Sequence, residues 1–83
     1  MLTKEEVERL KSEKKRVRKE AAVFLKENKP NYYTYEEVAK AISSDKDIVM
    51  DALMRLSVTP FGHVQSIQLA EKSGGFEYYY TYR

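Results

Sequence analysis

Apolar residues recur every three or four positions through the first third of the chain, and this spacing predicts an amphipathic helix. Thr3 and Glu6 have the spacing of a capping box, which places the start of the helix at this point. Helix-favouring residues continue to about Asn28, and Lys29-Pro30 ends the run. We therefore expect one long first helix within residues 1–28.

Two further capping signals predict a pair of shorter helices. Thr34 with Glu37 opens a helix over about 35–43, and Ser44 with Asp47 opens one over about 45–57. The inward stripes of these helices are expected to be Val38, Ala39 and Ile42 on the first, and Ile48, Val49, Ala52, Leu53 and Leu56 on the second. Before them, Tyr32-Tyr33 is expected to form a very short extended segment.

The last third of the chain has the pattern of a β-hairpin. Two strands are expected at 63–71 and 76–82, joined by a turn at Lys72-Ser73-Gly74-Gly75. Pairing about a two-residue turn puts Ile67 and Leu69 on the same face as the even-numbered tyrosines of the second strand. We therefore predict one core formed by Ile48, Leu53, Leu56, Ile67, Leu69, Tyr78 and Tyr80.

The order helix, short strand, helix, helix, hairpin resembles the winged-helix, or winged helix-turn-helix, superfamily of DNA-binding domains. The resemblance is carried by the stretches 32–42 and 47–56, and by Ser73-Gly74-Gly75 at the tip of the expected wing. It implies an α+β fold in a single domain of residues 1–83, with the helix-turn-helix at 34–57 and the wing at 63–82. It also implies a third helix that enters the major groove and a wing that contacts the backbone or minor groove.

Composition narrows the function classes. The 83 residues include no cysteine and only one histidine, His63, so neither a disulfide framework nor a zinc site is expected. No catalytic constellation or phosphate-binding glycine loop is visible, and we expect no enzyme, cofactor or small-molecule ligand. Apolar runs fall short of the roughly 20 residues that cross a bilayer. The first residues lack the apolar stretch of a signal peptide, so a cytoplasmic protein without membrane contact is expected.

The net charge of +2 is unevenly distributed along the chain. Residues 1–29 hold ten basic and six acidic side chains, whereas residues 30–83 hold five basic and seven acidic ones. A basic region of this kind suits the phosphates of double-stranded DNA. The candidate DNA-binding residues are Lys11, Lys14, Lys15, Arg18, Lys19, Lys46, Arg55 and Lys72. A solvated helix face is the alternative explanation for the basic run of the first helix.

The outer face of the third helix does not fit groove reading well. Asp47 and Asp51 would oppose the phosphates, and Met50 and Met54 have no hydrogen-bonding group for a base edge. Three interpretations remain open: a solvated face, a DNA contact through Lys46 and Arg55, and an adaptable protein contact through the two methionines. We expect a DNA-binding protein of low sequence specificity, a transcriptional regulator or nucleoid-type binder. The alternative is a winged-helix protein-interaction module.

Heptad spacing in the first helix predicts a homodimer. Apolar positions follow the a and d sites of a coiled coil, glutamates recur at every g site from Glu6 to Glu27, and Lys11 and Arg18 occupy e sites. In a parallel pair these charges attract each other across the two helices. The expected dimer interface is formed by Val7, Leu10, Lys14 and Val17. Packing of the same seam on its own domain is the alternative, and the two halves of the helix can also divide these roles.

Overall fold

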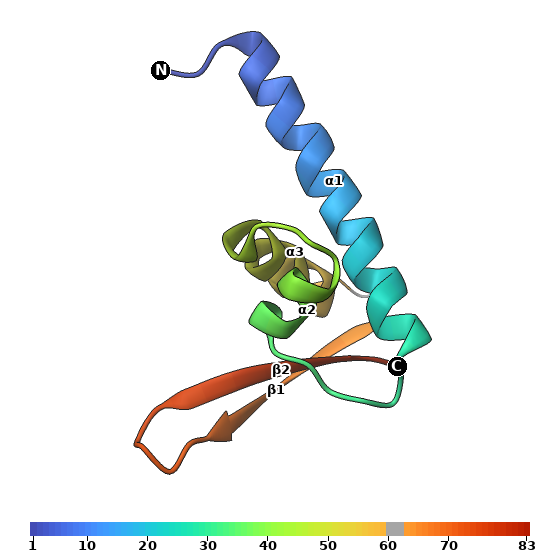
Figure 1. Cartoon of the computed structure of the whole chain (residues 1–83), viewed down its shortest axis with the longest axis vertical. Helices are drawn as coiled ribbons and strands as arrows, with labels where there is room; N and C mark the ends of the chain where they lie inside the picture. The colour runs from blue at the N-terminus through green and yellow to red at the C-terminus, as the bar shows by residue number, and fades with distance from the viewer. Residues whose placement is uncertain (60–62) are drawn as a thin grey trace.

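The computed structural model describes residues 1–59 and 63–83, and within them three helices precede a two-stranded antiparallel sheet (Figure 1). The elements are α1 (Lys4–Glu27), α2 (Tyr35–Ala41), α3 (Lys46–Val58), β1 (Val64–Ala70) and β2 (Phe76–Tyr82). This arrangement confirms the α+β class expected from the sequence. The sequence also predicts a break between the third helix and the hairpin at Thr59-Pro60-Phe61-Gly62, which falls largely outside the described residues.

Side-chain caps define where the helices begin. The Thr3 hydroxyl accepts the Glu6 N–H at 3.2 Å, and Thr34 and Glu37 form a complete capping box. The cap of α3 differs from the prediction, because Asp45 and not Ser44 is the N-cap residue. One carboxylate oxygen of Asp45 accepts the N–H groups of Asp47 and Ile48, at 2.9 and 3.3 Å. A carboxylate at this position also interacts favourably with the positive end of the helix dipole.

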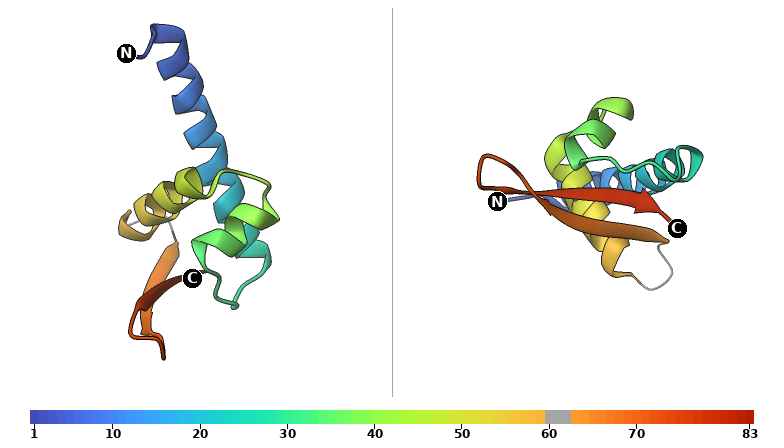
Figure 2. Two further views of the ribbon diagram at one scale, coloured as in Figure 1. Left: turned by 60° about the vertical axis from the view of Figure 1, so that its left-hand side comes forward. Right: turned by 90° about the horizontal axis from the view of Figure 1, so that it is seen from below.

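The core lies where the second half of α1 crosses α3. Val17, Ala21 and Leu25 of α1 are completely buried, and they pack with the apolar stripe of α3 and with Val38 of α2. Val64 and Tyr80 close the core from the hairpin. The first half of α1 stands clear of this body (Figure 2), and the molecule measures 44 × 28 × 24 Å.

A short extended segment joins the far side of β2. The Tyr33 N–H donates to the Tyr80 carbonyl at 2.9 Å, and the Tyr80 N–H donates to the Tyr33 carbonyl at 2.7 Å. The Thr81 hydroxyl also donates to the Asn31 carbonyl at 2.9 Å. The predicted extended segment at Tyr32-Tyr33 is therefore confirmed, and it attaches the base of the hairpin to the helical part of the domain.

The predicted register of the hairpin is wrong. The loop contains three residues, 72–74, because the Glu71 N–H donates to the Gly75 carbonyl at 2.8 Å and Gly74 has a φ of +93°. A loop with an odd number of residues pairs odd positions with odd ones, so Ile67 lies opposite Tyr79 and Leu69 lies opposite Glu77. Both apolar residues of β1 consequently move to the outer face of the sheet.

Three residues of the predicted core, Ile67, Leu69 and Tyr78, lie outside the observed core. Leu53 and Tyr80 are buried as predicted, and Ile48 and Leu56 pack partly buried against the core. Leu69 and Tyr78 are instead 51% and 50% exposed, and Ile67 is half-buried outside the core. Apolar surface that was assigned to the core is therefore open on the hairpin.

Candidate functional site

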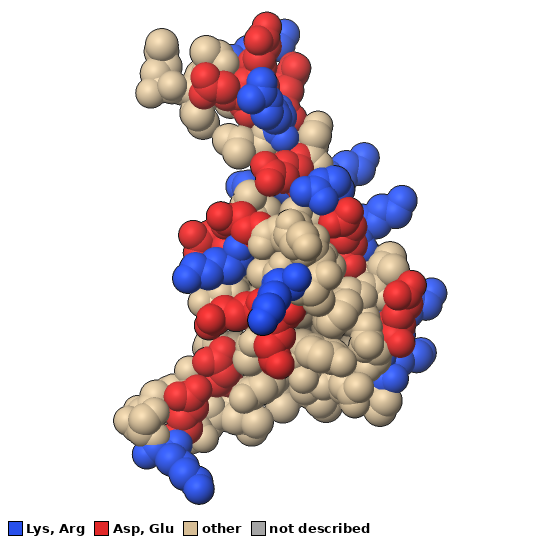
Figure 3. All heavy atoms as spheres, in the orientation of Figure 1, with Lys and Arg blue, Asp and Glu red and all other residues tan. Residues whose placement is uncertain are grey.

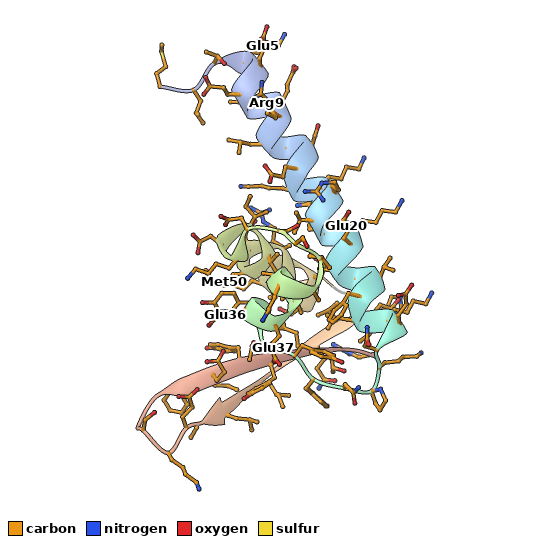
Figure 4. All side chains as sticks on the ribbon, in the orientation of Figure 1. Glu5, Arg9, Glu20, Glu36, Glu37 and Met50 are labelled. Atoms are coloured by element: carbon orange, nitrogen blue, oxygen red, sulfur yellow. The ribbon has the colours of Figure 1, made fainter. Side chains whose placement is uncertain are left out.

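A groove of about 720 Å³ runs between α3 and the hairpin, with the start of α2 at one side. Its apolar lining comes from the outer face of α3 and the inner face of the hairpin: Met50, Met54, Val58, Phe76 and Tyr78. Met50 is seen in Figure 4 to project from α3 on the same side of the domain as Glu36 of α2, above β2. The groove is the hollow between the third helix and the expected wing.

The spacing of residues along α3 explains why apolar side chains line this hollow. Val49, Ala52 and Leu53 form the stripe that faces the core, which leaves Met50, Met54 and Val58 one turn apart on the opposite side. Their exposed fractions are 37%, 54% and 80%. The sequence had marked Met50 and Met54 as a possible protein contact, and both lie in the groove.

The hairpin contributes the opposite wall. Even-numbered residues of β2 lie on the face toward α3, where Tyr80 is buried at the base and Phe76 is 67% exposed near the tip. Burial, reinforced by nearby Tyr78, Glu77 and Tyr35, raises the pKa of the Tyr80 hydroxyl. Sequence analysis did not single out Phe76, although the alternation of side chains along a strand places it on the same face as Tyr78 and Tyr80 in any register.

Carboxylates give the groove a negative character. Glu36 and Asp51 line it, and Glu77 contributes from β2 although its position alternates with the groove-facing Phe76 and Tyr78; the single basic residue in the lining is Arg55. The Arg55 guanidinium donates to the Asp51 carboxylate at 3.1 Å, so part of its charge is already matched within the chain. The space-filling view shows acidic side chains along this side of the molecule, down to the hairpin (Figure 3). The surface therefore combines an apolar lining with a negative border.

Five of the predicted DNA-binding residues lie together on α1, and within the described residues one of them shares a hollow with a predicted residue of another element. Arg18 of α1 and Arg55 of α3 line one shallow hollow with Leu56, Val58 and Thr59. Lys11, Lys15 and Lys19 are exposed along α1, and Lys14 is half-buried there. Lys46 is the first residue of α3, whereas Lys72 lies in the hairpin turn, at the opposite end of the molecule from the start of α1 (Figure 1). These cations therefore occupy separate regions.

The predicted dimer interface divides at the middle of α1. Val17 is fully buried against its own domain, whereas Leu10 is 38% exposed and Val7 and Lys14 are half-buried. All four residues lie on one side of the helix, the side that packs on α3 further along. A second α1 in parallel register would need the space that α3 occupies beside Val17. This leaves Val7, Leu10 and Lys14 as the part of the seam that another molecule can reach.

The remaining chemistry of the described residues is limited. Within 1–59 and 63–83 no group of three or more His, Asp or Glu side chains is placed to hold a metal ion. None of the described helices is long and apolar enough to cross a membrane. Comparison with protein families, curated proteins and solved structures finds no match to this chain.

Proposed function

We propose that this chain is a winged-helix protein-interaction module, and that the groove between α3 and the hairpin receives a segment of its partner. The observation that carries the proposal is the composition of the groove: its lining is apolar, and the carboxylates of Glu36 and Asp51 border it. In a winged-helix DNA binder the same two elements face the duplex. Here that face would set carboxylates against phosphates, which weakens binding to DNA.

The groove favours a partner segment with apolar side chains flanked by Lys or Arg. Phe76 and Tyr78 offer aromatic surface, and the exposed methionines adapt to side chains of different shape. Basic groups of the partner would meet Glu36, a groove carboxylate for which no ion pair is formed within the described residues. Charge complementarity of this kind steers association and disfavours acidic competitors.

The methionines provide a direct test of this proposal. The chain has three methionines, of which Met50 and Met54 line the groove while Met1 lies at the exposed start of the chain. With [13C-methyl]methionine, we expect a designed amphipathic Leu/Lys peptide to shift the signals of Met50 and Met54 and to leave that of Met1 in place. The matched control is the same peptide with glutamate in place of lysine, which we expect to bind much more weakly.

Two outcomes contradict the proposal. One is that neither peptide moves the Met50 and Met54 signals at any concentration tested. The other is that a random-sequence DNA duplex moves these two signals while the Leu/Lys peptide does not. Either result would show that the groove does not bind a protein segment of the proposed kind.

DNA binding of low sequence specificity is the second candidate, and the exposed lysines of α1 favour it. Lys11, Lys15 and Lys19 are spaced four apart and are all exposed, so they lie along one face of the helix. Affinity for a duplex should then fall steeply with salt, because binding releases condensed counterions. Replacing the three lysines by glutamine should flatten the salt dependence. Unchanged salt dependence in that variant would exclude α1 as the contact.

A further inference from the structure

β1 is an edge strand whose outward backbone groups are not used within the described residues. Hydrogen bonds join Glu71 to Gly75 at 2.8 Å and Arg83 to His63 at 2.7 Å, so the odd-numbered residues of this strand bond toward β2. The N–H and C=O groups of Ser66, Gln68 and Ala70 therefore point to the free edge. On β2 the corresponding outward groups of Tyr80 are bonded to Tyr33.

The free edge also lacks the usual protection against pairing. Val64–Ala70 contains seven residues without a charged side chain or a proline. Edge strands of soluble proteins are normally protected by lysine, proline, a bulge or a covering element, because an open edge can pair with another chain. β1 is long enough for several hydrogen bonds and has no such feature within its length.

We propose that β1 pairs with β1 of a second copy of this chain, antiparallel and about a two-fold axis, so that the two hairpins form one four-stranded sheet. Full overlap of the two strands sets the register, because the central residue of Val64–Ala70 is Ile67. Ile67 then lies opposite its own symmetry mate. Leu69 lies opposite the partner subunit's Gln65. The outward groups of Ser66 meet those of the partner subunit's Gln68, which satisfies both.

Side chains on the outer face of the sheet support this pairing. Ile67 and Leu69 lie on that face, where Leu69 is 51% exposed, and the pairing brings four such aliphatic side chains together across the axis. Val64–Ala70 carries no charged side chain, so the paired strands bring no like charges together within the shared ladder.

Single cysteines test the register, since the natural chain contains no cysteine. In the proposed dimer the two copies of residue 67 form a non-hydrogen-bonded pair, with Cα atoms about 4.5 Å apart, within the range that a disulfide spans. We expect Ile67→Cys to form a covalent dimer under mild oxidation. Gln65→Cys and Leu69→Cys are the matched controls, and each should stay largely uncrosslinked alone but form a mixed dimer when combined.

Sedimentation equilibrium of the intact chain tests the interface without crosslinking. Gln68→Pro removes an outward N–H that makes no bond within the described part of its own chain, so the monomer should keep its fold while the dimer dissociates. Met54→Lys, in the groove and away from the free edge, should leave the dimer intact. A monomeric wild-type chain, a dimer that survives Gln68→Pro, or equal crosslinking at positions 65, 67 and 69 would overturn the proposal. None of these outcomes bears on peptide binding by the groove.

Discussion

Two parts of the molecule project from the same core, in opposite directions and with opposite composition (Figure 1). The first half of α1 is rich in charge, with nine charged residues among positions 1–15. The outer half of the hairpin, 68–78, has three charged residues among eleven, and its apolar side chains Leu69, Phe76 and Tyr78 are each at least half exposed. Solvent exposure therefore concerns mainly charged side chains in the first half of α1, and it includes large apolar side chains in the hairpin.

The projecting half of α1 satisfies its backbone hydrogen-bonding groups within the helix. A helix bonds its backbone internally, and the first half of α1 carries opposite charges one turn apart, such as Glu5 and Arg9 (Figure 4). The outer half of the hairpin differs in two respects. Alternate backbone N–H and C=O groups at one edge of β1 form no hydrogen bond within the described residues, and the apolar side chains of this half face solvent. Within the described residues, the hairpin therefore leaves more apolar surface and more unbonded backbone groups open than the first half of α1 does.

The largest effect should come from the core that holds both projections. Leu53→Ala removes a fully buried side chain between α1, α3 and the hairpin, and we expect it to lower the free energy of unfolding by about 2–5 kcal/mol. The matched control is the adjacent Met54→Ala, on the groove side of the same helix, which should cost within about 0.5 kcal/mol. Denaturant titration of both variants measures the difference. Equal losses would mean that Met54 is as well packed as Leu53.

Local patterns allowed the helices to be predicted closely, because caps and apolar spacing are properties of neighbouring residues. Even the error at the cap of α3 is one position, since Ser44 and Asp45 are both good capping residues. The hairpin register could not be derived in the same way. Gly74 and Gly75 each tolerate a positive φ, so the sequence accommodates loops of even and odd length, and one residue of difference exchanges the two faces.

The candidate groove could be predicted only in part. Met50 and Met54 were recognised from the outer stripe of α3, and the even-numbered residues of β2 face the helices in either register. Sequence analysis assigned Tyr78 to the core, whereas the structure leaves it half exposed in the groove beside Phe76. Charge in the linear sequence was equally incomplete as a guide. Arg18 and Arg55 meet although 37 positions separate them, whereas Lys72 lies far from the other predicted cations because the hairpin extends away from α1.

An intermediate effect is expected in the hairpin turn. Gly74 has a φ of +93°, a conformation that costs a residue with a Cβ about 1–2 kcal/mol, so Gly74→Ala should lower the stability by that amount. Gly75→Ala is the control, because Gly75 has no positive φ and a Cβ there would meet only the Glu71 carboxylate at 4.0 Å. Thermal unfolding of both variants gives the comparison. If Gly75→Ala is the more damaging variant, the loop does not contain the three residues 72–74.

The smallest effect should come from the projecting half of α1. Leu10→Glu places a carboxylate on a seam that contacts nothing in the core, and we expect the free energy of unfolding to change by less than about 0.5 kcal/mol. It should also leave a dimer formed through β1 unchanged in sedimentation equilibrium, because Leu10 lies on α1, outside the β1 edge. The matched variant is Val17→Glu, one heptad further along, where burial of an unpaired carboxylate should unfold much of the domain. Loss of the dimer in Leu10→Glu, with the fold intact, would instead place the contact between the two copies on the seam of Val7, Leu10 and Lys14.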